Sequence, residues 1–211
     1  MKLYRPVGLY EMEKILEKAG KEFPVRFSEQ PIFYPVLNVC YARQIAEKWN
    51  QKDFNSGFVG FITEFDIDDN YIESHEVHCV GGKEHLEYWI PAEELQEFNK
   101  KMKNKITIIE AYYGNQYIGI KPTGISGFKE EGINNQIDTL KSLMSYNPMD
   151  FSGTVFVEWK LINLNFLYWK QKMKYNEKIM EEIYFCLKRN SKLFIDINED
   201  SISMKNSTEK S

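Results

Sequence analysis

The stretch from Gly81 to Tyr113, GGKEHLEYWIPAEELQEFNKKMKNKITIIEAYY, decides how the rest of this chain is interpreted. A glycine pair opens it, and an aromatic strand over 87–90 follows, which Pro91 ends. The strand begins with Glu87, and a carboxylate leading into a buried strand is unusual. Burying a charge costs free energy unless the charge has a partner or a task. The stretch therefore predicts a site at Glu87.

Length and composition limit the class of protein. The chain has 211 residues, enough for one large domain, or for a domain of about 120–150 residues with an appendage. Aromatic residues make up 15% of it, which favours a core or cleft built from rings. The net charge of −4 gives no indication of a nucleic-acid or anionic-membrane partner.

The sequence also predicts where the protein works. No run of residues approaches the roughly 18 apolar residues of a membrane span, and the first residues lack the apolar segment of a secretory signal. Cys40, Cys79 and Cys186 are an odd number of cysteines without a CxxC spacing. We therefore expect a reduced, cytoplasmic protein without a membrane partner.

Hydrophobic periodicity predicts the helices and strands of the chain. We expect them to form an α+β fold with a split, mainly antiparallel sheet, flanking helices and a C-terminal helical extension. Asn38 is the expected N-cap of one helix. The expected elements of the first part are strands at 3–8, 57–67, 76–80, 87–90 and 105–112, and helices at 11–18, 41–49 and 92–102. Prolines at 24, 31 and 35 place the extended segment between the first two helices at a sheet edge or cleft rim.

A glycine-rich stretch over 114–135 is the best candidate for a boundary. It divides the chain into a first domain over 1–120, an α/β extension over 121–202 and a polar, disordered tail over 203–211. In the extension we expect helices at 133–144 and 170–187 and a short strand at 192–197, while 154–167 fits either a strand or a helix.

Two segments before Glu87 supply complementary chemistry. Arg5 lies on the first strand, and arginine offers a fixed fork of donors that suits phosphate or ribose oxygens. Tyr34 lies in the aromatic segment IFYPVLN, and its ring can stack on a flat heterocycle. A carboxylate can stabilise positive charge that develops at an anomeric carbon. These are the parts needed to cleave a nicotinamide N-glycosidic bond, although a surface ion pair for Arg5 and a solvated Glu87 remain the plain alternative.

The order of these residues resembles the ADP-ribosyltransferase fold, with an arginine on the first strand, a tyrosine on the second and a glutamate on a late one. The block Glu87-Tyr88-Trp89-Ile90-Pro91 looks like the strand that carries the catalytic glutamate in that family. The segments YRPVG, QPIFYPVLN and EYWIPAEELQEFN are also similar to short bacterial proteins labelled "ADP-ribosylation/crystallin J1". The resemblance covers about residues 3–113.

The resemblance implies an NAD-dependent transferase. In it Glu87 is catalytic, and Arg5, Tyr34, Asn38 and His85 bind NAD, with no metal. The second motif lacks Ser-Thr-Ser, and His85 stands where members that modify arginine carry Glu or Gln. Arginine is therefore not the expected acceptor, and protein, nucleic acid, a small molecule and water all remain open.

Four alternatives stay open beside it. The chain could be a catalytically inactive nucleotide-binding module, or a protein-interaction module that acts through 121–202. A zinc site is conceivable because four potential ligands fall within eleven residues, namely His75, His78, Cys79 and His85. A cation site is conceivable at the acidic residues Glu64, Asp66, Asp68 and Asp69, which are better explained as a solvated strand end and turn.

Overall fold

A computed structural model describes residues 1–128, 132–172 and 177–197 of the chain. The chain divides into two compact units, Met1–Tyr117 and the part from Ile118 onward. The fold is of mixed α and β class with small antiparallel sheets, which confirms the predicted class at that level. The predicted tail at 203–211 lies outside the described residues.

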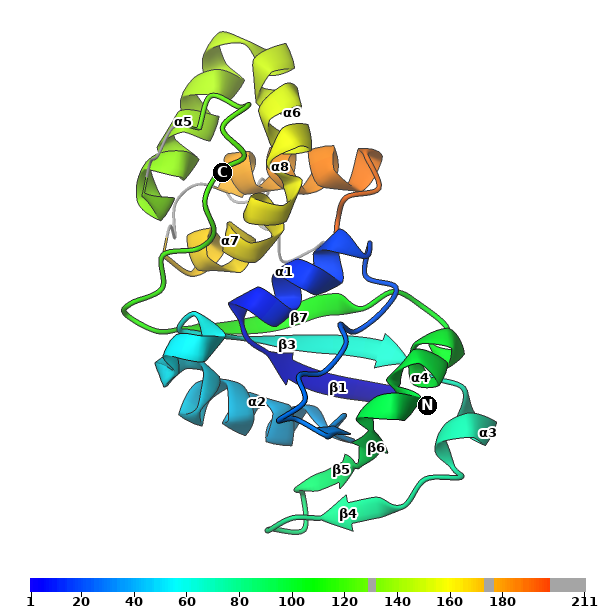
Figure 1. Cartoon of the computed structure of the whole chain (residues 1–211). Helices are drawn as coiled ribbons and strands as arrows, with labels where there is room; N and C mark the ends of the chain where they lie inside the picture. Colours follow the sequence, from blue (N-terminus) through cyan, green and yellow to red (C-terminus); the bar gives the residue numbers. More distant parts are fainter. Residues whose placement is uncertain (129–131, 173–176, 198–211) are drawn as a thin grey trace, which may run out of the picture. The chain divides into compact units, whose positions relative to one another are not determined.

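The first unit is built on a three-stranded antiparallel sheet with the order β1-β3-β7 (Figure 1). Its strands are β1 (Lys2–Val7), β3 (Val59–Asp66) and β7 (Thr107–Tyr113). The three corresponding strands predicted from the sequence are therefore confirmed to within two residues at each end. Both faces of β3 are buried, since each face carries a helix.

Helix α2 (Val39–Lys48) covers one face of this sheet. Asn38 caps it, because its side-chain oxygen accepts a hydrogen bond from the backbone N–H of Tyr41, as the sequence predicts. The helix approaches β3 closely at Gly60, where an added Cβ would lie 2.6 Å from the Cα of Ala46. Only glycine at this position lets the helix lie this close to the strand.

Helix α1 (Leu9–Glu17) covers the opposite face (Figure 1). An aromatic cluster fills the core on this side, with ring centroids 4.8 to 6.4 Å apart; its members are Phe23, Phe33, Phe65 and Phe98. The richness of the sequence in phenylalanine thus serves the core of the first unit.

Two short strand pairs flank the central sheet. β2 (Ile32–Phe33) pairs with β6 (Ile90–Pro91), and β4 (Val77–Cys79) pairs with β5 (Leu86–Tyr88). The single strand predicted over 87–90 is therefore wrong in detail. The chain changes its partner at Trp89, because β5 pairs with β4 whereas β6 pairs with β2.

The remaining elements of this unit are short. The helix predicted over 92–102 begins as a 3₁₀ turn, η3 (Ala92–Glu94), and continues as α4 (Leu95–Lys101). The others are α3 (Asp69–Ile72), η1 (Asn50–Lys52) and η2 (Phe54–Ser56).

The second unit is helical in its described part. It contains α5 (Ile133–Tyr146), α6 (Pro148–Val157), α7 (Trp159–Lys172) and α8 (Glu177–Arg189). The segment 154–167, open between strand and helix in the sequence, is helical. The strand predicted at 192–197 is wrong, since these residues are irregular apart from one bridge residue, Ile195. Residues 173–176 of the helix predicted over 170–187 lie outside the described residues.

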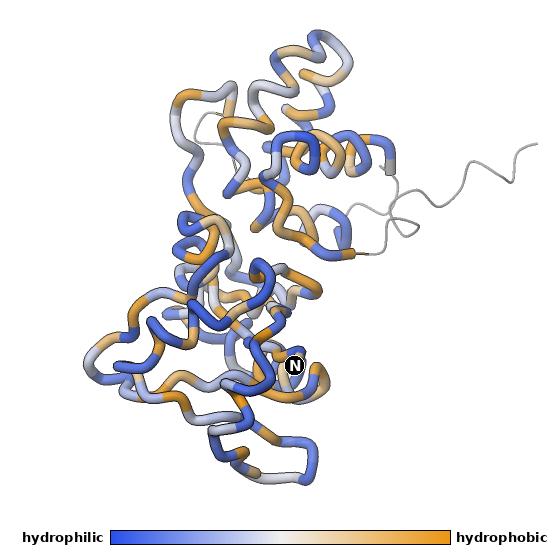
Figure 2. The backbone as a smooth tube through the Cα atoms, turned by 90° about the vertical axis from the view of Figure 1, so that its right-hand side faces the viewer, coloured by the Kyte–Doolittle hydropathy of each residue, from blue (hydrophilic) through white to orange (hydrophobic). Residues whose placement is uncertain are grey.

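Helix α7 is the core of the second unit and is buried on nearly all sides. Its polar core residues are satisfied internally: Asn165 donates to the side chain of Gln136 at 3.0 Å, and the Trp169 indole donates to the carbonyl of Ile133 at 2.7 Å. Hydrophobic and hydrophilic segments alternate along the helices of this unit (Figure 2). Within the described ranges, no helix combines the length and apolar character that crossing a bilayer requires.

Candidate functional site

The candidate site lies where the sheet of the first unit splits. The segment around Val36 continues the sheet beyond β1, because the N–H and C=O groups of Tyr4 and Val36 exchange hydrogen bonds of 2.9 and 2.8 Å. Val36 in turn forms a bridge with Glu87, so the segment lies between β1 and β5. Continuing the antiparallel register places Pro6 opposite Tyr34. Proline has no N–H to donate, and the ladder ends there.

A pocket of about 300 Å³ lies at this split. Three of the residues that the sequence predicts for the site line it, together with three apolar residues; the set is Arg5, Pro6, Tyr34, Val36, Ile45 and Glu87. The structure thus brings together residues that are up to 82 positions apart in the sequence. An apolar pocket with a few convergent polar groups is the usual form of a small-molecule site.

Glu87 is buried, with 8% of its surface exposed. Both of its carboxylate oxygens accept a hydrogen bond: Oε1 from the indole N–H of Trp89 at 2.7 Å, and Oε2 from the hydroxyl of Tyr41 at 3.3 Å. No cation pairs with it among the described residues. Because both donors are neutral, they do not cancel the charge of this buried carboxylate, which can therefore act on a ligand in the pocket.

The guanidinium of Arg5 is held firmly on the α1 side of the sheet. Its Nε and Nη2 donate to the two carboxylate oxygens of Glu11 at 2.9 and 3.3 Å, and Nη1 donates to the carbonyl of Tyr34 at 3.1 Å. The group also lies over the ring of Phe33, 4.5 Å from its centroid. These contacts use three of the five N–H donors of an arginine, and two remain for a ligand.

Tyr34 and Trp89 form an aromatic rim. Their rings meet edge to face with centroids 6.2 Å apart, and 38% and 44% of their surfaces are exposed. Trp89 also stacks on His78, with ring centroids 4.1 Å apart and an interplanar angle of 17°. Exposed rings fixed in this way offer a surface on which a flat ligand can pack.

Asn38 and His85 have different surroundings and are not among the residues that line the pocket. Asn38 caps α2 and also donates from its side chain to the carbonyl of Glu84. The Nδ1 atom of His85 accepts from the N–H of Gly82 at 3.2 Å, so its Nε2 carries the proton and donates to Gln44 at 3.0 Å. The ring of His85 stacks on Tyr41, with centroids 4.5 Å apart. Both residues therefore contact the region around Tyr41, the donor to Glu87.

The sequence did not indicate three residues that the structure brings to the site: Glu11, Tyr41 and Trp89. Trp89 could have been found, because residues two apart in a strand project to the same side and it follows Glu87 by two. Tyr41 follows the N-cap by three positions, which alone does not direct its hydroxyl to Glu87. Burial, followed by the charge of Glu87, raises the pKa of Tyr41 to about 12, so the hydroxyl stays protonated and remains a donor.

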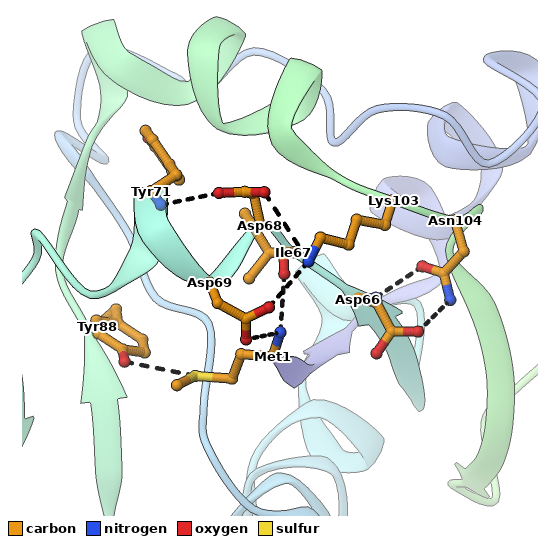
Figure 3. Close-up of polar contacts among 9 residues, drawn as sticks. All are labelled: Met1, Asp66, Ile67, Asp68, Asp69, Tyr71, Tyr88, Lys103 and Asn104. Carbon is orange, nitrogen blue, oxygen red and sulfur yellow. Dashed lines mark hydrogen bonds and ion pairs between the residues drawn. The ribbon is translucent and has the colours of Figure 1, made fainter.

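Three of the four acidic residues that suggested a cation site form hydrogen bonds or ion pairs with neighbouring groups of the protein (Figure 3). Asp66 accepts from Asn104, Asp68 caps the short helix α3, and Asp69 lies between the Met1 ammonium and Lys103. The Met1 ammonium, then Lys103, lowers the pKa of Asp69 to about 2. Among the residues that the structure describes, no group of three or more His, Cys, Asp or Glu could hold a metal ion.

A larger groove of about 1150 Å³ lies between α1, the segment after it and α4. Its lining mixes lysine and glutamate side chains, including the exposed ion pair between Lys18 and Glu22. Such pairs stabilise little and are typical of a solvated surface. We therefore base the functional argument on the smaller pocket, which contains buried polar groups.

Comparisons of the chain with protein-family models, with curated proteins and with solved structures gave no match. The functional argument therefore depends on the geometry of the pocket.

Proposed function

We propose that the pocket at the sheet split binds the nicotinamide riboside half of NAD, and that the protein is an ADP-ribosyltransferase-like enzyme of the cytoplasm. Glu87 supports this most directly, because it is a buried carboxylate on a pocket wall with neutral donors on both oxygens and no cationic partner among the described residues. A cationic ligand or transition state would supply the positive charge that the Glu87 carboxylate lacks as a partner.

The reaction follows from this arrangement. The bond between the ribose C1′ and the pyridinium nitrogen breaks, and its electron pair goes to the ring, which leaves as neutral nicotinamide. Positive charge then develops at C1′, where the Glu87 carboxylate stabilises it. A nucleophile on the acceptor forms the new bond to C1′ and loses its proton to solvent or to a base. Water as the acceptor gives ADP-ribose.

Other residues in the pocket, and Trp89 beside it, support binding and orientation. Tyr34 and Trp89 offer ring faces to the pyridinium, and a cationic ring packs favourably against aromatic groups. Val36 and Ile45 exclude water from one wall, which strengthens the field of Glu87. The resemblance to the ADP-ribosyltransferase fold adds to these observations.

The test is titration of the purified protein with NAD in a calorimeter, with nicotinamide release followed by chromatography on the same samples. Glu87→Gln should abolish release, with a loss of at least about a hundredfold, and should leave NAD affinity within a few fold. Glu84→Gln is the matched control, because it removes an exposed carboxylate three residues earlier and outside the pocket.

Binding without release in the unaltered protein would favour the second candidate, a nucleotide-binding module without turnover. Release that persists in Glu87→Gln would show that Glu87 is not the catalytic group. No binding at millimolar NAD would overturn the assignment of the cofactor.

A further inference from the structure

The segment Val25-Arg26-Phe27 has a reversed burial pattern, with its apolar side chains exposed and its charged side chain buried. Val25 and Phe27 are exposed over 81% and 63% of their surfaces, whereas the side chain of Arg26 between them is only 11% exposed. Burial ordinarily favours the reverse, since arginine is among the residues least often buried unless it is paired. The fold therefore turns a charge inward at the expense of two apolar side chains.

Arg26 is poorly compensated in this position. Its Nη1 lies 3.7 Å from a carboxylate oxygen of Glu11, too long for a hydrogen bond, and its buried Nε has no hydrogen-bond partner in the described structure. Burial lowers the pKa of Arg26, and the charge of Arg5 lowers it further. An unsatisfied buried donor needs an explanation, and a missing ion or ligand is one of the few available.

The surroundings show which ligand would satisfy it. Arg5 and Arg26 share the single carboxylate of Glu11, so the cluster carries one excess positive charge. Arg5 donates three of its N–H groups to Glu11 and to the Tyr34 carbonyl. The side chain of Arg26 makes no hydrogen bond among the described residues. Arg5 also lines the pocket that contains Glu87, which places the cluster at the pocket's edge.

We propose that Arg26, with the two remaining donors of Arg5, binds an oxyanion of the phosphate class at the edge of this pocket. Glu11 positions both guanidinium groups, and its single charge leaves one positive charge uncompensated, which favours an anionic ligand. This inference deepens the proposed function, on which its NAD arm rests. It assigns the diphosphate of the ligand to Arg26, a residue that the sequence did not indicate. Arginine is well suited to this task, because its planar fork matches phosphate oxygens.

The test compares inorganic pyrophosphate, NAD and nicotinamide riboside, which carries no phosphate, by calorimetric titration at fixed salt. Arg26→Met should weaken pyrophosphate and NAD binding by about tenfold to a hundredfold, the loss typical of a charged hydrogen-bonded contact. It should leave nicotinamide riboside affinity within about twofold. Arg26→Lys keeps the charge and should retain part of the affinity.

Arg43→Met is the control. Arg43 pairs with Glu110 on the α2 side and does not line the pocket, so its removal should leave pyrophosphate binding unchanged. Stability separates a binding role from a structural one. Removing Arg26 takes away a desolvated charge without a hydrogen bond, so the melting temperature of Arg26→Met should stay equal or rise.

Three results would overturn the inference. The first is that neither pyrophosphate nor NAD binds the unaltered protein at about 10 mM, a concentration above the millimolar Kd of weak sites. The second is that Arg26→Met and Arg26→Lys bind pyrophosphate like the unaltered protein, and the third is that both variants lose binding together with folded structure. The two proposals fail separately. Pyrophosphate binding that depends on Arg26 without nicotinamide release would remove the proposed reaction alone. Release that is unchanged in Arg26→Met would remove the phosphate site alone.

Discussion

The two hydrogen bonds to Glu87 can be weighed by a double-mutant cycle. Trp89→Phe removes the indole donor at 2.7 Å, and Tyr41→Phe removes the hydroxyl donor at 3.3 Å. Hydrogen bonds to charged groups contribute about 1.5–3 kcal/mol, and leaving a buried acceptor unsatisfied adds to that cost. We expect about 2–3 kcal/mol of destabilisation for Trp89→Phe and about 1 kcal/mol for the longer bond of Tyr41→Phe.

The cycle is completed in the Glu87→Gln background. Charged hydrogen bonds are roughly twice as strong as neutral ones, so each donor should lose about half of its effect there. The coupling energy is then about 1 kcal/mol for Trp89 and about 0.5 kcal/mol for Tyr41. The stacking of Trp89 on His78 does not involve Glu87, and its loss cancels in the cycle.

Amide hydrogen exchange in the β1–β3 ladder is the appropriate assay, because these amides report the opening of the first unit alone. Distant, independent residues add within about 0.3–0.5 kcal/mol. A coupling between Trp89 and Glu87 below that limit would refute the geometry, since a 2.7 Å bond to a buried carboxylate could not then exist in solution.

Three further perturbations test other parts of the fold. Gly60→Ala should destabilise the first unit by about 3 kcal/mol or more, measured by urea denaturation, because the new methyl group meets the backbone of Ala46 at 2.6 Å. Glu158→Gln should cost about 2–3 kcal/mol and speed exchange of the Thr123 amide, since the buried carboxylate holds that N–H at 3.0 Å. Tyr71→Phe should leave stability at pH 7 equal or higher, because the buried Tyr71 hydroxyl has no hydrogen-bond partner in the described structure. Burial, then Glu94 and Glu97, raises the pKa of Tyr71 to about 12, so the unaltered protein should lose stability as pH rises between about 10 and 12, and Tyr71→Phe should lose less in a pH series of melts.

The sequence predicted the elements of the first unit because their signals are local. Asn38 precedes an apolar stripe at helical spacing, and its side chain caps α2 as expected. The alternation over 57–67 marks β3, whose two faces carry different helices. The sequence did not predict the break at Trp89. A strand that changes its pairing partner within one apolar run has the same hydrophobic pattern as a continuous strand.

The candidate site was predicted only in part. Arg5, Tyr34 and Glu87 stand out as residue types, and all three line one pocket. Their partners did not stand out, because the contact between Arg5 and Glu11 joins a strand to a helix and depends on packing. The inward turn of Arg26 runs against hydrophobic patterning altogether. Residue type predicts that a charged side chain is exposed, and this prediction fails where the fold buries a charge. Such failures are expected at functional sites.

The position of the pocket follows from backbone chemistry. A segment paired to β1 through Val36 would ordinarily continue its ladder past Tyr4 and close the sheet. Pro6 cannot donate at the next paired position, where it lies opposite Tyr34. Pro35 faces the other neighbour, since its carbonyl accepts from the backbone N–H of Tyr88 at 2.9 Å. The two segments therefore separate just beyond a well-formed pair, and side chains line the pocket that is left between them. A rigid sheet holds both walls of this gap, so Arg5 and Glu87 keep fixed positions on its two sides without a ligand, and little ordering free energy remains to be lost when one binds.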